Sequence, residues 1–188
     1  MILRALIPTV FAALLMPAIQ SSLISPPAMA QQPPKKKAQP AVEKPGGPKP
    51  IGRFDDWIAA THPEAGQPVC YAFTRAQNSL PALAGRGAVV LTVTQRASGR
   101  DAVAIEAGFA FAPNAAVTVQ ADQTGLDFYT SQRAAVARNG HAAVTAFQAA
   151  GRAIARSPGP RDAKVTDTFS LKGFSAAYAA ISKACPPK

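Results

Sequence analysis

The sequence has few of the residues that most often build catalytic and metal sites. Its 188 residues include two cysteines, two histidines and one tryptophan. His62 and His141 lie far apart in the sequence, so they do not show metal-ligand spacing. Cys70 and Cys185 form no C-x-x-C pair, and the chain has no G-x-S-x-G motif. We therefore expect no catalytic, metal or cofactor site, and a protein that is not an enzyme.

Acidic residues are also scarce. The chain has ten Asp and Glu residues and twenty Lys and Arg residues, which gives a net charge of +10. One run, Lys35, Lys36 and Lys37, indicates attraction to an anionic surface such as lipopolysaccharide, acidic lipid or nucleic acid. The simpler interpretation is a solubilising spacer. We favour the spacer because no aromatic residue is interleaved for base stacking.

A long hydrophobic run occurs only at the N-terminus. Residues 5–19 are largely apolar, and Ala28-Met29-Ala30 matches the A-x-A cleavage pattern. We expect residues 1–30 to be a secretory signal peptide, cleaved between Ala30 and Gln31. An uncleaved membrane anchor is the alternative, but polar residues and prolines interrupt the run below the roughly 20 residues that a span needs.

The composition changes twice after this leader. Residues 31–50 are mostly Pro, Lys, Gln and Gly, which cannot bury enough apolar surface to offset the entropy of ordering. We expect a disordered, proline-extended linker there. Residues 51–188 are long enough to form one domain with its own core.

Short alternating stretches dominate the first half of this domain. Apolar residues recur at every second position near residues 69–73, 89–93 and 103–111. Turn sequences separate such stretches, which is typical of an antiparallel β-sandwich or barrel. Helical periodicity predicts a short helix near 141–150 and a C-terminal helix near 174–184. The predicted fold is therefore mainly β, with two helices.

The C-terminal helix carries the second cysteine on its apolar stripe. The stripe is formed by Phe174, Ala177, Tyr178, Ile181 and Cys185. In an exported chain two cysteines are normally paired, so we expect a disulfide between Cys70 and Cys185. Closing so long a loop contributes at most about 4–5 kcal/mol in the chain-entropy model. The alternative is a redox or nucleophilic thiol, which lacks a C-x-x-C partner here.

Two further residues have alternative interpretations. Asp167 alternates with apolar residues on its strand, which suggests either a general base or a carboxylate that caps backbone groups or pairs with an arginine. We favour the structural role because no histidine or second carboxylate lies close in sequence. Trp57 is expected to anchor the core or an edge of the first strand, rather than to form a ligand platform.

Several segments resemble one protein family. Phe54-Asp55-Asp56-Trp57 resembles the F-x-D-W opening of the invasion-associated locus B family, and Val69-Cys70-Tyr71 resembles its first cysteine strand. Residues 166–177 resemble its strongest signature, D-T-[FY]-S-L-x-G-F-x-A-A, and Lys183-Ala184-Cys185 follows. Residues 103–119 keep the family's rhythm of a strand, a Phe-rich bend and a short V-T-V strand.

This resemblance implies a small exported protein of Gram-negative bacteria with a β-sandwich-like fold. It would be periplasmic, or secreted and associated with the outer membrane. The founding members of the family are associated with host-cell invasion, and no enzymatic mechanism comes with the family.

We therefore expect a non-catalytic, virulence-associated envelope protein that binds a partner at the cell envelope or host interface. The first alternative is an electrostatic binder of anionic envelope polymer or nucleic acid through the basic tail. The second is a hydrolase that uses Asp167 or a histidine.

Overall fold

The computed structural model describes residues 47–187, which form one mainly β unit. Its strands are β1 (Lys49–Phe54), β2 (Trp57–Glu64), β3 (Gln67–Arg75), β4 (Asn78–Leu80), β5 (Val90–Arg96), β6 (Gly99–Glu106), β7 (Ala116–Ala121), β8 (Thr124–Ser131), β9 (Ala134–Ala137), β10 (Arg152–Pro158) and β11 (Lys164–Ser170). The helices are α1 (Gly140–Ala149), the 3₁₀ turn η1 (Pro160–Asp162) and α2 (Phe174–Ala184). The prediction of a mainly β fold with two helices near 141–150 and 174–184 is confirmed.

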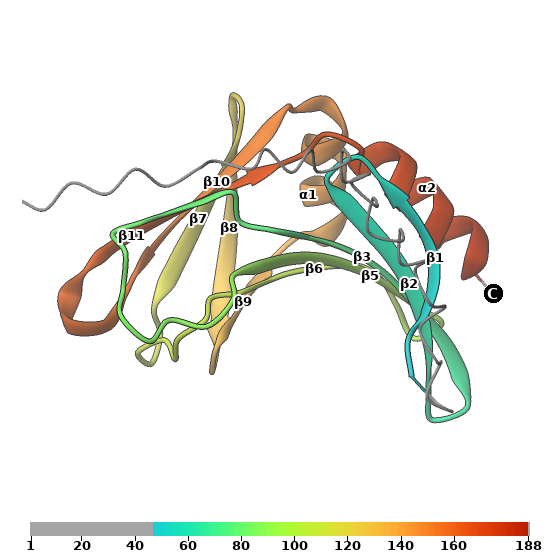
Figure 1. The fold of residues 1–188 in the computed structure, drawn as a ribbon, viewed down its shortest axis with the longest axis horizontal. Helices are drawn as coiled ribbons and strands as arrows, with labels where there is room; N and C mark the ends of the chain where they lie inside the picture. Colours follow the sequence, from blue (N-terminus) through green and yellow to red (C-terminus); the bar gives the residue numbers. More distant parts are fainter. Residues whose placement is uncertain (1–46, 188) are drawn as a thin grey trace, which may run out of the picture. The chain divides into compact units, whose positions relative to one another are not determined.

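All strands belong to a single 11-stranded sheet in the order β1-β2-β3-β5-β6-β9-β8-β7-β10-β11-β4. Every neighbouring pair is antiparallel. The sheet curves but does not close, because β1 and the short β4 are its two edges (Figure 1). The domain is therefore sandwich-like rather than a closed barrel.

The helices cover only one of the two sides of the sheet. Residues of the inner side alternate with residues of the outer side along each strand. The inner side packs against both helices, with α2 over β1, β2, β3 and β5, and α1 over β6 and β8. We call the uncovered side the outer side.

The core lies between the inner side of the sheet and the helices. Trp57 is fully buried, as expected for a core anchor, and its Nε1 donates a hydrogen bond to the Ser170 carbonyl at 3.1 Å. The Trp57 ring also meets Phe174 of α2 at 4.9 Å between ring centres, and Phe174 meets Phe147 of α1 at 5.6 Å. Each such buried side chain contributes about 1.5–3 kcal/mol of transfer free energy. These rings hold the helices on the sheet.

Two glycines permit the close approach of the helices to the strands. Gly173, before α2, has φ 87° and lies so close to the Phe54 carbonyl that a Cβ atom would collide with it. Gly140 begins α1 directly against the Asp101 carbonyl, again leaving no room for a Cβ atom. Asn139 caps α1, and its side chain accepts a hydrogen bond from the Ala142 amide at 3.0 Å. Small residues thus set how closely helix and sheet pack.

The domain begins earlier than the composition indicates. Lys49 and Pro50 pair with Thr61 and Ala60 in the β1–β2 ladder. The predicted linker boundary at Pro50 is therefore too late, because strand pairing recruits residues whose composition alone is typical of a linker. The remainder of the linker up to residue 46, the predicted cleavage between Ala30 and Gln31, and the Lys35–Lys37 run lie outside the described residues.

Candidate functional site

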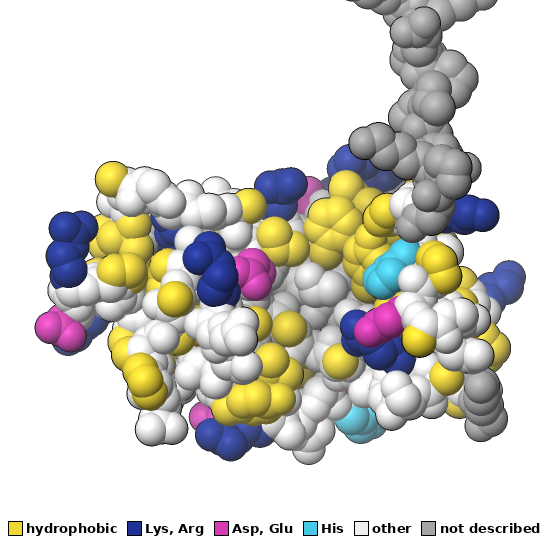
Figure 2. Space-filling model, turned by 90° about the horizontal axis from the view of Figure 1, so that it is seen from below, with side chains coloured by type: hydrophobic (Ala, Val, Ile, Leu, Met, Phe, Trp, Pro, Cys, Tyr) yellow, Lys and Arg dark blue, Asp and Glu magenta, His cyan; other side chains and the backbone are white. Residues whose placement is uncertain are grey.

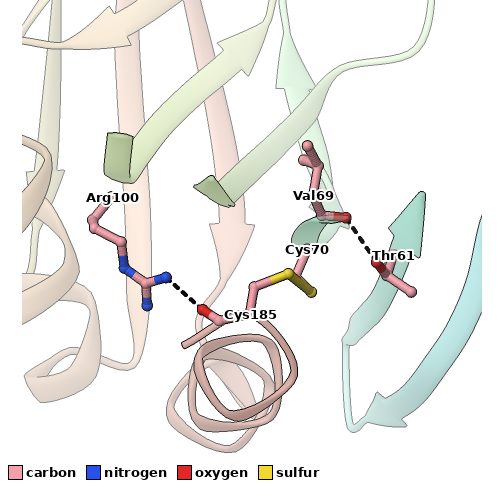
Figure 3. Close-up of a disulfide and its surroundings, with 5 residues drawn as sticks. All are labelled: Thr61, Val69, Cys70, Arg100 and Cys185. Carbon is pink, nitrogen blue, oxygen red and sulfur yellow. Dashed lines mark hydrogen bonds between the residues drawn. A yellow bond between two sulfur atoms is a disulfide. The ribbon is translucent and has the colours of Figure 1, made fainter. Parts of the chain in front are cut away.

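The disulfide joins the third strand of the domain to the end of its last helix. Cys70 of β3 and Cys185, at the end of α2, are bonded, with their Cα atoms 5.9 Å apart and a sequence separation of 115. Both residues are buried on the inner side of the sheet. Near the bond, Arg100 donates a hydrogen bond to the Cys185 carbonyl, and Thr61 donates one to the Val69 carbonyl (Figure 3). The bond fastens α2 to β3, and neither cysteine is a free thiol.

Asp167 is engaged in a buried ion pair. It lies on the inner side of β11, where both of its carboxylate oxygens accept hydrogen bonds from Arg86 at 2.8 and 2.7 Å. The Arg86 and Asp167 side chains are only 6% and 4% exposed. Arg86 also donates to the Ala107 carbonyl at 2.9 Å and lies 5.0 Å from the centre of the Phe109 ring. The arginine-paired interpretation of Asp167 is confirmed.

A second polar group surrounds Asp101 at the start of β6. Its Oδ1 accepts hydrogen bonds from Gln95 at 2.7 Å and from the Tyr178 hydroxyl at 2.8 Å. Its Oδ2 lies 3.2 Å from Nδ1 of His141, whose side chain is 83% exposed. Asp101 has φ 55°, and its amide donates back to the Gln95 side chain. This group ties β5, β6, α1 and α2 together.

The surroundings lower the pKa of Asp101 and raise the pKa of Tyr178. Burial alone would raise the pKa of Asp101, but hydrogen bonds from Gln95, Tyr178 and His141 together outweigh it, so the pKa lies below its ordinary value. Burial raises the pKa of Tyr178, and its hydrogen bond to the Asp101 carboxylate raises it further. Asp101 is therefore a charged acceptor and Tyr178 a neutral donor at pH 7.

The histidines do not come together in the structure. His62 lies on the outer side of β2, whereas His141 lies in the first turn of α1. In residues 47–187, the structure has no group of three His, Cys, Asp or Glu side chains able to hold a metal ion. His141 contacts the same carboxylate that accepts the hydrogen bond of the Tyr178 hydroxyl. The contact connects β6 to α1.

The uncovered side of β2, β3 and β5 carries a cluster that we call the aromatic face: His62, Tyr71, Phe73, Val90, Thr92 and Thr94. The rings of Tyr71 and Phe73 lie 6.1 Å apart with only 27° between their planes, and His62 meets Tyr71 edge-on at 5.5 Å. Cross-strand pairing places Thr94 opposite Tyr71 and Thr92 opposite Phe73. These partly exposed side chains and Arg96 line a shallow groove of about 350 Å³.

A second groove continues from the aromatic face. It has a volume of about 440 Å³ and is lined by Gly47, Lys49, Thr61, His62, Pro63, Gly66, Gln67 and Pro68. His62 lines both grooves. Figure 2, which views the protein from below, shows hydrophobic side chains gathered in patches between charged ones. The arrangement offers apolar contact area with hydroxyl groups beside it.

Comparison with known proteins identifies the family. A family model described as invasion associated locus B (IalB) protein matches residues 57–182. The chain belongs to the invasion associated locus B family. The structure is also similar to the crystal structure of invasion associated protein B from Bartonella henselae, with a TM-score of 0.53 and 17% sequence identity. That likeness covers 71% of this chain and 97% of the other, and at this identity it shows the fold alone. The search of curated proteins found no match.

The segment that most resembles the invasion associated locus B family has a structural role here. Asp167 holds Arg86, Phe169 fills the core, and Gly173 lets α2 begin beside Phe54. The family is not a known enzyme family.

Two polar residues were missed by the sequence reasoning. Nothing in the sequence spacing pairs Arg86 with Asp167, because the two residues lie 81 positions apart. Asp101 follows the β5–β6 turn and gave no signal of its contact with Tyr178. An unpaired charge in an apolar alternation, as at Asp167, was the one clue that a buried partner was needed.

Proposed function

We propose that this chain is an exported, non-catalytic envelope protein that binds a partner protein through its aromatic face. The observation that carries this proposal is the aromatic face itself, a set of partly exposed rings on a sheet side that neither helix covers. Aromatic side chains supply much of the binding energy at protein interfaces, especially where they lie in a row with polar groups around them.

The proposed location rests on the leader and the cysteines. Residues 1–30 have the pattern of a signal peptide, and the paired Cys70 and Cys185 suit an oxidising compartment. No helix among the described residues is long and apolar enough to cross a membrane. We place the protein in the periplasm, or secreted and associated with the outer membrane of a Gram-negative bacterium. The Bartonella henselae protein of similar fold is named for an association with invasion, which adds the host interface as a candidate setting for binding.

The proposal of a non-catalytic role follows from what the acidic and basic groups already contact. Asp167 is saturated by Arg86 and closed off from solvent. In the described structure the His141 ring contacts the Asp101 carboxylate and the His62 ring meets Tyr71 edge-on, and no Ser, Thr or Cys side chain is hydrogen-bonded to either ring. The chemistry of a hydrolase would need such a constellation.

The basic tail supports a separate, electrostatic contribution. Lys35, Lys36 and Lys37 would attract an anionic polymer, and such binding weakens steeply as salt concentration rises. Deleting residues 31–46 from the full chain and measuring binding at two salt concentrations tests this contribution. An unchanged affinity and salt dependence would remove it.

The partner proposal is tested by quantitative capture from envelope and host-cell surface fractions. The bait is the full chain, compared with the variants Y71A/F73A and Y129A. Tyr129 provides a matched control, because it is an exposed aromatic on β8 rather than on the aromatic face. We expect at least one protein that the wild type and Y129A capture equally and that Y71A/F73A captures at least tenfold less. The affinity of that purified protein for each variant then verifies direct binding.

Equal capture by all three baits would contradict the proposal. Melting temperatures establish that Y71A/F73A is folded, which is expected because both rings are partly exposed.

A further inference from the structure

The outer side of β7, β10 and β11 forms a second exposed surface, chemically unlike the aromatic face. Alternation along these strands sends Val119, Ala155 and Phe169 into the core. The residues between them point outward. We call this surface the basic face, and its members are Thr118, Gln120, Arg152, Ile154, Arg156, Lys164, Thr166 and Thr168.

The register of the strands places hydroxyl groups on both sides of a central guanidinium group. Arg156 of β10 pairs with Thr118 of β7 and with Thr166 of β11. Neighbouring strands are about 4.8 Å apart, so both threonines lie directly beside Arg156. Lys164 is the diagonal neighbour of Arg156, and the Cα atoms of such neighbours lie about 7–8 Å apart. Arg152 is four residues from Arg156 on the same strand, at about 13 Å.

The three cations of this surface are not neutralised. Among the described residues, Arg152, Arg156 and Lys164 have no ion-pair partner within 4.0 Å. The outer sides of β7, β10 and β11, which are described over their full length, carry no carboxylate. Asp167, the acidic residue of β11, faces the core and is saturated by its own arginine. The neighbouring strand β8 places Asp127 opposite Thr118 on the same outer side. Three cations against this carboxylate leave the basic face with an excess of positive charge, which favours an anionic ligand.

An exposed aromatic ring lies at the margin of the basic face. Tyr129 of β8 is 43% exposed and pairs with Ala116 of β7 on the outer side of the sheet. The guanidinium of Arg138 lies 5.8 Å from the centre of its ring. An aromatic ring presents a flat surface against which the C–H face of a sugar ring packs.

We propose that the basic face binds an acidic polysaccharide. Its cations would hold carboxylate or phosphate groups along the chain, its threonines would hydrogen-bond sugar hydroxyl groups, and Tyr129 would pack against a sugar ring. Charge complementarity favours an anionic ligand, and the threonine hydroxyl groups along β7 and β11 favour a polymer with many hydroxyl groups. Single-stranded nucleic acid fits less well, because its binding sites stack successive bases on several aromatic rings. This site lies on different strands from the aromatic face and takes a different class of ligand, so it goes beyond the proposed function.

The test measures affinity of the full chain for immobilised polygalacturonate, an acidic polysaccharide, at low and physiological salt. Dextran is the neutral control polymer, and a single-stranded oligonucleotide is the competing polyanion. The decisive variant is R156Q/K164Q. Its matched control is R53Q/R75Q, which removes the same charge from exposed arginines of β1 and β3. Y71A/F73A serves as a further control for the aromatic face.

We expect the wild type to bind polygalacturonate but not dextran, with affinity that decreases as salt is raised. R156Q/K164Q should bind at least tenfold more weakly and with a smaller salt dependence, whereas R53Q/R75Q and Y71A/F73A should change affinity less than threefold. The proposal is overturned by no binding to polygalacturonate, by equal losses in R156Q/K164Q and R53Q/R75Q, or by tighter binding to the oligonucleotide. Melting temperatures near that of the wild type show that the exposed substitutions leave the domain folded.

Discussion

Replacing Asp167 by asparagine should destabilise the domain severely, because it leaves the guanidinium of Arg86 buried without a counter-charge. The Arg86 side chain is 6% exposed and makes two hydrogen bonds to this carboxylate, at 2.8 and 2.7 Å. Breaking a buried ion pair by removing one partner costs about 3–5 kcal/mol. Since domains of this kind are stable by about 5–15 kcal/mol, the loss is a large part of the total.

Urea unfolding with the disulfide intact measures this loss. Trp57, the only tryptophan, is fully buried and reports unfolding by fluorescence. With a slope of about 2 kcal/mol per molar urea, D167N should lower the midpoint by about 1.5–2.5 M. The matched control is E64Q, which breaks the exposed Arg96–Glu64 pair, whose side chains are 39% and 52% exposed. That control should cost about 1 kcal/mol or less.

A paired replacement separates the charge from the packing. The double variant R86M/D167L removes both charges together. It should therefore be more stable than D167N, even though the Met and Leu side chains must pack where the ion pair was. Two results would contradict this explanation: equal losses of stability in D167N and E64Q, or a double variant less stable than D167N. Either result would show that an unpaired Arg86 charge is not the cause of the loss.

The other predictions concern the disulfide, the Asp101 group and the start of α2. The C70A/C185A variant should lose up to about 4–5 kcal/mol of unfolding free energy, measured by urea unfolding. A loss below about 1 kcal/mol would contradict a stabilising role of the disulfide. Because the pKa of Asp101 is lower when folded, its stabilisation is present above about pH 4 and disappears as pH falls through the folded pKa. The D101N variant should therefore show a smaller loss of stability than the wild type as the pH falls from about 5 to about 2. Because the pKa of Tyr178 is raised when folded, its contribution is present below about pH 10 and is lost at higher pH, and Y178F should flatten the alkaline stability curve. Gly173→Ala should lower the melting temperature by several degrees, since φ 87° and the neighbouring Phe54 carbonyl both exclude a Cβ atom; an unchanged melting temperature would show that α2 can shift.

Much of the fold could be predicted from local patterns. The β10–β11 hairpin, with Arg156 opposite Thr166, follows from alternation on both sides of a Pro-Gly-Pro turn. The β7–β8 hairpin likewise pairs Val117 with Phe128. Such features involve residues close in sequence, where the spacing of apolar residues and the turn chemistry act directly.

The start of the domain was harder to predict. Lys49 and Pro50 have the composition of a linker but form part of β1, because β2 offers them backbone hydrogen-bond partners. Strand edges depend on a neighbour that local composition does not reveal.

The candidate sites depended most on tertiary structure. The aromatic face joins residues of β2, β3 and β5, and the basic face joins residues of β7, β10 and β11. Either grouping needs the order of strands in the sheet and the side to which each residue points. A shift of one residue in register would send each of these side chains to the opposite side.

The sequence by itself determined the family, the β-rich class, the two helices and the pair of cysteines available for one bond. These follow from local periodicity, a specific C-terminal motif and a count of residues. Only the tertiary structure decided that Asp167 meets Arg86, that Asp101 connects two strands to two helices, and that rings and cations gather on separate parts of an uncovered sheet. The physical reason is that long-range pairing brings together residues whose separation in sequence carries no information about their contact.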